Sequence, residues 1–287
     1  MKKALMDDVS LKLLSRGYVV KTVLGCFDII ARNGSRILLL KVLEDADSVN
    51  IESVESMKRI AGYVAGTPLI IAEKSGERLV DNVVHSRFGI FTINTRTFAN
   101  CLDNKLPFVK SQKAGLVAEV IGVQLKKLRE NEGLSLKMIS RKLGVSPRMI
   151  SKYEVGEAEI TINKAMKIYD VFGGRIFKPI NVFDFHGNYK GIGNSKLSEK
   201  YKELGFESSE TKKAPFDIIS RKDNELILTK IGDKIDVNLN PISKMVNADE
   251  LIIFKKKKPK GIPALTEDEF LDFDKAKELI KFLKETR

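Results

Sequence analysis

The stretch "SLKMISRKLGVSPRMISKYE", residues 135–154, contains two short helical patterns separated by a tight turn. Ser135 precedes the first pattern and Gly144 follows it, and these residue types are favoured at the two ends of a helix. Ser146 precedes the second pattern, and Pro147 stands at the first helical position, where a missing N–H costs nothing. The stretch therefore predicts two helices that a short turn holds at a steep angle.

Two more helical patterns flank this pair, "VQLKKLREN" at 123–131 and "TINKAMKIYDVFGG" at 161–174. Apolar residues recur at helical spacing in each, as expected for helices with one face in a shared core. The residues expected to face this core are Ile121, Leu125, Leu128, Ile150, Tyr153, Ile162, Ala165, Ile168 and either Tyr169 or Phe172. Residues 115–180, with 12 Lys or Arg against seven acids, therefore form a basic, all-α block.

This block resembles the Cro/C1-type (XRE family) helix-turn-helix, which has the lambda-repressor-like fold. The resemblance implies that helix 146–154 enters the DNA major groove by its N-terminal end. Arg148 suits a bidentate contact to guanine, and Lys152 suits guanine or a phosphate. The expected DNA-binding residues are Ser146, Pro147, Arg148, Ser151 and Lys152, with Lys137 and Arg141 from the preceding helix.

The resemblance also implies an ion pair between Arg129 and Glu154, joining the first and third helices of the block. The alternative is that both charges are solvated. Leu136 departs from the family, which usually has Gln at this position for a phosphate contact, and Lys137 could substitute for it. The alternative for the whole block is a scaffold that binds proteins.

Outside this block, the chain contains the same hairpin pattern twice. "FDIIARNGSRILLLK" at 27–41 and "FDIISRKDNELILTK" at 216–230 are identical at seven of 15 positions. Each follows a helical pattern, at 7–18 and at 194–206, that ends at a Gly followed by an aromatic residue. We infer an internal duplication in which the second copy has a shortened or absent helix after its hairpin.

Each hairpin places an Asp near its start and a Lys at its end, as in the PD-(D/E)xK nuclease superfamily. Alternate residues of a strand point to the same face, so the superfamily's Asp, second acid and Lys can share a Mg²⁺ and a water molecule. The resemblance makes the outer blocks restriction-endonuclease-like domains. The matching pairs are Asp28 with Lys41 and Asp217 with Lys230.

The second acid of that motif is missing from both copies. Leu39 and Leu228 stand two residues before the motif lysines, and leucine cannot bind a metal. Glu52 or Glu55 could replace the acid in the first copy. The favoured interpretation is that the hairpins are structural, and we expect no catalysis, no metal and no cofactor.

Composition points to a polyanionic partner, because the 287 residues carry a net charge of +12 with a pI near 9.5. The alternative is a heat-tolerant, Lys- and Glu-rich surface. The run "KKKKPKG" at 255–261 is either a solvated turn or a segment that assists non-specific binding to phosphates.

The chain has two Cys and two His, too few for a zinc site or a disulfide framework.

No signal peptide or transmembrane run is present, so we expect a cytoplasmic protein without membrane contacts. The predicted fold class is α/β plus all-α. It comprises two related restriction-endonuclease-like domains, at 1–105 and 195–287, around a helix-turn-helix domain at 115–180.

The whole arrangement resembles a family of archaeal HTH-type transcriptional regulators. This resemblance implies a sequence-specific regulator of double-stranded DNA. Because one helix-turn-helix covers only a few base pairs, we expect a homodimer. The outer blocks are expected to pair, within or between chains, and so to set the distance between the reading helices. The apolar stripe of the last helix either joins the dimer interface or closes its own domain. The alternatives are a Mg²⁺-dependent nuclease, or an antitoxin or controller that binds a protein partner.

Overall fold

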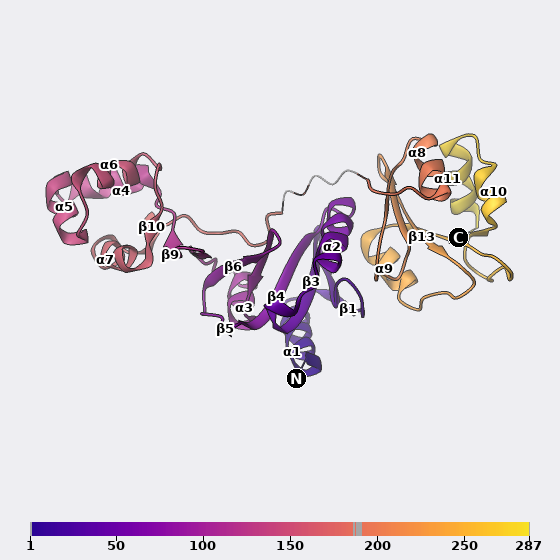
Figure 1. The fold of residues 1–287 in the computed structure, drawn as a ribbon, viewed down its shortest axis with the longest axis horizontal. Coiled ribbons are helices and arrows are strands. Elements are labelled where there is room, and N and C mark those ends of the chain that lie inside the picture. Colours follow the sequence, from indigo (N-terminus) through magenta and orange to yellow (C-terminus); the bar gives the residue numbers. More distant parts are fainter. Residues whose placement is uncertain (1, 186, 188–190, 287) are drawn as a thin grey trace. The chain divides into compact units, whose positions relative to one another are not determined.

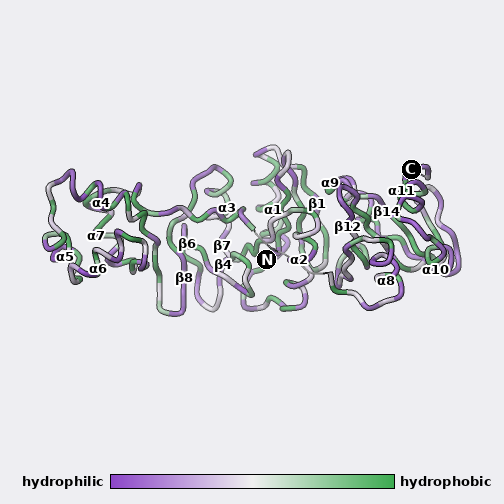
Figure 2. The backbone as a smooth tube through the Cα atoms, turned by 90° about the horizontal axis from the view of Figure 1, so that it is seen from above, coloured by the Kyte–Doolittle hydropathy of each residue, from purple (hydrophilic) through white to green (hydrophobic). Residues whose placement is uncertain are grey.

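The computed structural model describes residues 2–185, 187 and 191–286. The chain forms two compact units, which Figure 1 shows as a ribbon: Met1–Ile71 together with Phe183–Arg287, and Ala72–Val182. Hydrophobic stretches lie largely in the strands and on the inner sides of helices, with hydrophilic stretches in many of the turns (Figure 2). Among the described residues, no helix combines the length and the apolar character needed to cross a membrane.

Residues 2–71, which we call lobe 1, contain a helix, an antiparallel three-stranded meander, a second helix and a further strand. Strand β2 pairs with β1 on one side and β3 on the other, and β4 is the next strand beside β3. The elements are α1 (Lys2–Leu14), β1 (Val19–Thr22), β2 (Ile29–Asn33), β3 (Arg36–Asp45), η1 (Ala46–Ser48), α2 (Ile51–Tyr63) and β4 (Thr67–Ser75), whose last residues belong to the second unit.

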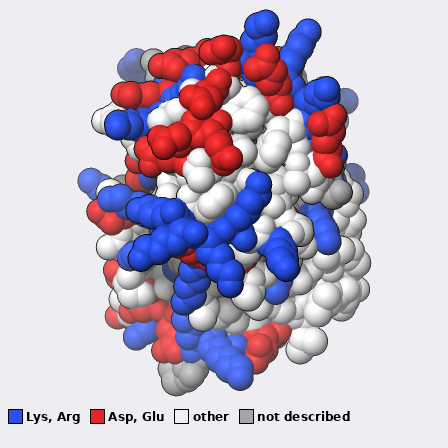
Figure 3. Space-filling view, turned by 90° about the vertical axis from the view of Figure 1, so that its right-hand side faces the viewer, with Lys and Arg blue, Asp and Glu red and all other residues white. Residues whose placement is uncertain are grey.

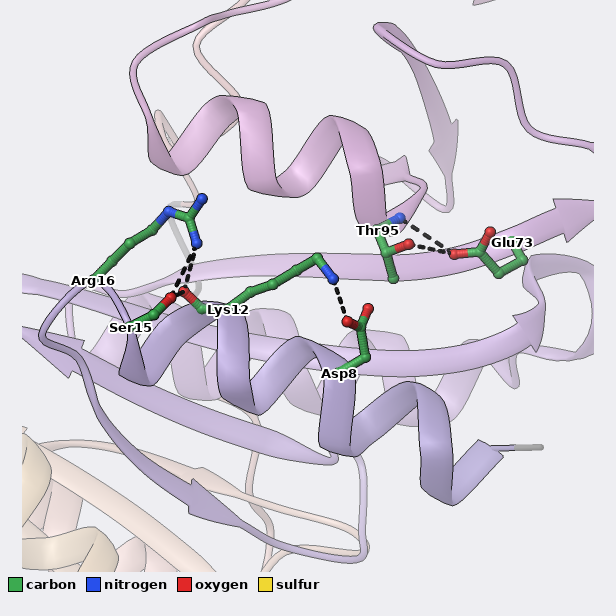
Figure 4. Close-up of polar contacts among 6 residues, drawn as sticks. All are labelled: Asp8, Lys12, Ser15, Arg16, Glu73 and Thr95. Atoms are coloured by element: carbon green, nitrogen blue, oxygen red, sulfur yellow. Dashed lines mark hydrogen bonds and ion pairs between the residues drawn. The ribbon is translucent and has the colours of Figure 1, made fainter.

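Helix α1 ends before the predicted limit of 7–18 and continues further toward the N-terminus. Arg16 Nη1 and Ser15 Oγ donate to the carbonyl of Lys12 at 2.9 and 3.0 Å, which satisfies one of the last carbonyls of the helix (Figure 4). Gly17 follows with φ of +75°, the left-handed conformation that commonly ends a helix.

Residues 191–286, which we call lobe 2, repeat this order of elements. The sheet order is β11-β12-β13-β14-β15, with antiparallel pairs as far as β13 and parallel pairs after it. The elements are α8 (Lys196–Glu203), β11 (Glu207–Glu210), β12 (Ile218–Lys222), β13 (Glu225–Ile231), α9 (Leu239–Val246), β14 (Asp249–Ile253), β15 (Ala264–Leu265), α10 (Glu267–Leu271) and α11 (Ala276–Glu285). Helix α9 has 8 residues where α2 has 13, so the helix expected to be shortened or absent is shortened.

The last helix packs on its own lobe. Leu279 and Leu283 of α11 are almost fully buried within the core cluster of lobe 2, which also holds Tyr201, Ile227 and Phe270. Of the two predicted roles for this apolar stripe, the structure therefore shows that it closes its own domain.

The two lobes contact each other through equivalent groups. Arg32 Nη1 donates to the carbonyl of Met245 at 2.6 Å, and Arg221 Nη1 donates to the carbonyl of Tyr63 at 2.6 Å. The two arginines occupy the same hairpin position, and each carbonyl lies two residues before the residue of positive φ that follows its helix, Ala65 after α2 or Asn247 after α9. This reciprocity is that of an isologous, two-fold dimer interface, formed here within one chain.

The second unit begins as a small sheet and continues into four helices. Strand β6 pairs with β7 and β8, β8 with β9, and β9 with β10. Glu73 Oε1 accepts hydrogen bonds from Thr95 N and Oγ1 at 3.3 and 2.7 Å, fixing the start of α3 (Figure 4). The elements are β5 (Glu77–Arg78), β6 (Val83–Arg87), β7 (Ile90–Ile93), α3 (Thr95–Leu102), β8 (Val109–Gln112), β9 (Gly115–Ala118), α4 (Gly122–Asn131), α5 (Leu136–Leu143), α6 (Pro147–Glu154), β10 (Ile160–Thr161), α7 (Ile162–Phe172) and η2 (Gly174–Ile176).

The four helices α4 to α7 enclose one apolar core. Leu125, Ile139, Ile150 and Ile168, one from each helix, are at most 1% exposed. Phe172 packs against this core, so of the two alternatives for the last helix it supplies the contact, whereas Tyr169 is 51% exposed. The packing fixes α5 and α6 relative to each other, and this pair carries the predicted DNA-binding residues.

Candidate nucleic-acid interface

Helix α6 is fixed by its start and by its inner face. Ser146 Oγ accepts the backbone N–H of Met149 at 3.2 Å as the N-cap, and Pro147 occupies the first turn. Ile150 and Tyr153 are buried, and burial raises the pKa of the Tyr153 hydroxyl. Because these groups fix the helix on one side, the opposite side is presented rigidly.

The opposite side of α6 and part of α5 are open to solvent. Lys152 is half-buried. The exposed members of the predicted set are Ser146, Pro147, Arg148, Ser151, Lys137 and Arg141. The structure therefore brings the predicted set together on two consecutive helices.

Helix α5 begins at a cap like that of α6. Ser135 Oγ accepts the backbone N–H of Met138 at 3.2 Å, and Gly144 ends the helix with φ of +66°. Leu136, where the family usually has a polar residue, is half-buried and packs against the four-helix core. Its side chain thus strengthens packing and offers no hydrogen bond to a phosphate.

An ion pair links α4 to the end of α6. Arg129 Nε donates to Glu154 Oε1 at 2.5 Å and Arg129 Nη2 to Glu154 Oε2 at 3.1 Å, a bidentate arrangement. Arg129 Nη1 also donates to the carbonyl of Leu134 at 3.0 Å. The hydrogen bond to Glu154 raises the pKa of the Arg129 guanidinium. The two charges are paired and largely shielded from solvent, unlike the solvated alternative.

A glycine allows α4 to approach α6 closely. A Cβ on Gly122 would lie 2.1 Å from the carbonyl oxygen of Glu154 and 2.7 Å from that of Tyr153. These are backbone atoms, which cannot move aside cheaply. The ion pair between the same two helices depends on this approach, and the sequence patterns alone did not single out Gly122.

In lobe 1, both carboxylate oxygens of the motif aspartate accept hydrogen bonds from other groups of the lobe. Asp28 is 1% exposed, and its Oδ2 accepts the backbone N–H of Val42 at 2.9 Å. Its Oδ1 lies 3.3 Å from Lys41 Nζ and 2.9 Å from Lys2 Nζ. Lys41 Nζ also donates to the carbonyl of Gly25 at 2.7 Å. Asp28 therefore ties three segments of the lobe together.

Lobe 2 repeats the same geometry. Asp217 Oδ2 accepts the backbone N–H of Ile231 at 2.7 Å, and Lys230 Nζ lies 3.1 Å from Asp217 Oδ1 and 3.0 Å from Oδ2. The Asp217 side chain is more open than that of Asp28, with 36% of its surface exposed. The shared bond to the residue after the lysine shows that the aspartate pins the end of the hairpin in both lobes.

The Mg²⁺ of the nuclease superfamily does not fit this set of groups. Leu39 and Leu228, at the position of the second acid, are 0% exposed and lie in the core. Glu52 lies 3.7 Å from Lys212 and Glu55 lies 2.9 Å from Lys58, so these acids are engaged with lysines. Within residues 2–185, 187 and 191–286, no group of three or more His, Cys, Asp or Glu is placed to hold a metal.

Lys2 is a contact of the motif that sequence reasoning missed. It lies 26 positions before Asp28, and no spacing rule links the start of a helix to a residue so distant in sequence.

Burial raises the pKa of the Cys26 thiol to about 12, so this thiol, two residues before Asp28, stays protonated.

Comparisons with known proteins identify both kinds of domain. Residues 2–107 match a PD-(D/E)XK superfamily domain, and residues 125–177 match a helix-turn-helix domain. No solved structure gives a significant match to the chain.

Full-length relatives come from archaea and share one name, "Putative HTH-type transcriptional regulatory protein". One from Methanospirillum hungatei is 32% identical over 79% of this chain and 78% of its own length. One from Methanocaldococcus jannaschii is 29% identical over 99% of this chain and 97% of its own, and one from Thermococcus gammatolerans is 29% identical over 91% and 89%. The chain belongs to the family of archaeal HTH-type transcriptional regulatory proteins that these relatives represent.

Proposed function

We propose that the chain is a sequence-specific transcriptional regulator that reads double-stranded DNA with α6 in the major groove. The observation that carries this proposal is the face of α6, where Arg148 and Ser151 are exposed while Ile150 and Tyr153 hold the helix from behind. The major groove is wide enough to admit an α-helix, so a helix with one exposed side can enter it.

Each side chain has a role that follows from its chemistry. Arg148 makes the bidentate contact to guanine, and Lys152 contacts guanine or a phosphate. Ser146 and the N-terminus of α6 suit a phosphate oxygen. Pro147 and Ser151 complete the base-facing surface, and Lys137 and Arg141 of α5 contact the DNA backbone.

The two lobes act as a frame without catalytic activity. Both motif aspartates are occupied by a backbone N–H and a lysine, and both second-acid positions hold a buried leucine. With Mg²⁺ or Mn²⁺ present, plasmid DNA should therefore stay intact. In functional terms the chain divides into 1–105, 115–180 and 195–287, the central part being the reader.

One helix-turn-helix covers only a few base pairs, so a symmetric operator needs two reading helices. The two lobes of one chain pair with each other. The second reading helix therefore has to come from a second chain, and we expect a homodimer on DNA.

Selection from a random duplex library with the purified full chain tests this function. Repeated rounds should enrich a common sequence motif, arranged as an inverted repeat if a dimer binds. A retained pool that stays random in sequence would contradict sequence-specific reading, and cleavage of the library in Mg²⁺ would contradict the structural role of the lobes.

A further inference from the structure

The loop between β14 and β15 carries five lysines in the six residues 255–260, with no acid among them. All five, Lys255, Lys256, Lys257, Lys258 and Lys260, are exposed. Among the described residues none of them forms an ion pair within 4.0 Å. Like charges held this close repel one another, so the loop is predisposed to bind a polyanion.

A single carboxylate organises the backbone of this loop. Asp233 Oδ1 accepts the backbone N–H groups of Lys255, Lys256 and Lys257 at 2.8, 3.0 and 3.4 Å. These hydrogen bonds, led by that of Lys256, lower the pKa of Asp233. These hydrogen bonds therefore order the backbone of the first three lysines of the run.

Both ends of the loop are also fixed. Phe254 N donates to the carbonyl of Leu265 at 3.0 Å, and Ile252 N donates to that of Pro263 at 3.0 Å. A loop fixed at its ends and its middle loses less conformational entropy on binding than a free lysine tail.

The loop lies at the edge of the sheet that carries the degenerate motif. Strands β13 and β14 are parallel, with Lys230 opposite Ile252, so the residues that follow both strands leave the sheet at the same edge. Figure 3 views the side that lies on the right in Figure 1 and shows Lys and Arg side chains gathered over part of the visible surface, with Asp and Glu side chains near them.

The corresponding stretch of the first copy has no such charge. In residues 73–78, Glu73 and Glu77 balance Lys74 and Arg78. The shared fold therefore does not require a lysine run at this position. We take the run in lobe 2 as a feature of ligand binding and not of folding.

We propose that the 255–260 loop is a second DNA-binding site, which contacts backbone phosphates without reading the sequence. The proposal rests on the proposed function, because the helix-turn-helix domain of the same chain keeps duplex DNA at a high local concentration near the loop. A membrane surface is a poorer ligand, because the loop lacks the large apolar side chains that insert between lipids.

The test compares three full-length variants on a labelled mixed-sequence duplex over a range of KCl concentrations. The first is Lys255→Gln/Lys256→Gln/Lys257→Gln, and the second is the matching arginine variant. The control, Lys275→Gln/Lys277→Gln/Lys281→Gln, removes the same charge from exposed lysines at and on α11. Equal thermal midpoints would show that all three fold.

Each phosphate contact contributes about −0.9 to the slope of log affinity against log salt. The glutamine variant of the loop should therefore bind more weakly, with a slope smaller by about 2–3. The arginine variant should keep the parental slope, and the control should change it little. A loop variant with the same slope as the control would overturn the proposal.

Failure of the loop and failure of the proposed function give different results. If the parent selects a sequence motif and the glutamine variant of the loop keeps the parental salt slope, the role of the loop alone is refuted. A parent without sequence preference, whose loop variant still loses slope, refutes the reading helix alone. Loop-dependent binding to double-stranded RNA or phosphatidylserine vesicles, with no loop dependence on DNA, would also overturn the proposal.

Discussion

Arg129 stabilises the reader domain through a pair of charges that solvent barely reaches. Only 10% of its side-chain surface and 8% of that of Glu154 are exposed. Removing one charge leaves the other buried and unpaired, which lowers the free energy of unfolding much more than the loss of a surface ion pair does. The position of α6 in the helix-turn-helix domain therefore depends on a residue of another helix, α4, which lies away from the exposed side of α6.

We predict that Arg129→Met lowers the free energy of unfolding of the helix-turn-helix domain by about 3 kcal/mol. The double variant Arg129→Met/Glu154→Leu should recover much of this loss, because no buried charge remains. Chemical denaturation of the full chain, followed by a fluorophore in that domain, measures both. Equal losses for the single and double variants would show that the charges are effectively solvated.

At the scale of single residues, resemblance and chemistry predicted different things. The charged pair of α4 and α6 was implied by the family pattern, and the structure forms it. The contact of Lys2 with Asp28 and the close approach at Gly122 carry no local signature, because each depends on a partner from another element. Such contacts become visible only when the elements are packed.

Among the elements, the hairpins depend on their aspartates to different extents. Asp28 is buried and holds a backbone N–H and two lysines, whereas Asp217 is one-third exposed and holds one lysine. Water can replace part of what Asp217 supplies, whereas it barely reaches the Asp28 side chain, which is 1% exposed.

We predict that Asp28→Ala lowers the free energy of unfolding by about 3–5 kcal/mol and that Asp217→Ala lowers it by about 1–2 kcal/mol. Urea denaturation, monitored by circular dichroism, compares the two. Addition of Mg²⁺ should leave both midpoints unchanged. A larger loss for Asp217→Ala, or a Mg²⁺-dependent midpoint in the parent, would contradict a structural role for these residues.

Caps, turns and helical periodicity made many elements predictable, whereas others carried no such signal. Helices α5 and α6 begin after the predicted serines because Ser135 and Ser146 accept the first free N–H groups. Strands β8 and β9 were missed, although they form a local hairpin with Gln112 opposite Gly115, because residues 104–116 show no regular alternation of apolar and polar residues. Helix α1 begins at Lys2, earlier than the predicted pattern at 7–18.

At the scale of the whole molecule, the duplication was predictable but the pairing of its copies was not. The repeated hairpin identifies two related lobes in the sequence. The groups that join them are two arginines and two backbone carbonyls, and a carbonyl is present at every residue. Sequence patterns therefore left open whether the lobes pair within or between chains, and the reciprocal bonds form within one chain.

We predict that Arg32→Ala and Arg221→Ala each weaken the pairing of the lobes by about 1.5–3 kcal/mol, because a hydrogen bond from a charged donor is lost. The double variant should unfold in two steps, one for each lobe. Lys196→Ala, at an exposed position of lobe 2, serves as the control. Coincident single transitions at the parental urea concentration in all variants would show that the lobes do not depend on these bonds.

The proposed function depends on α6 contacting base pairs, with Arg148 making the main specific contact. The most direct measurement is the affinity of the parent, Arg148→Ala and the control Lys167→Ala for the selected duplex and for versions with single base-pair changes. Arg148→Ala should lose about 1–3 kcal/mol and relax the preference at one base pair, while the preferences elsewhere and the control stay parental. An Arg148→Ala protein that binds every duplex as the parent does would contradict the assignment of α6 as the reading helix.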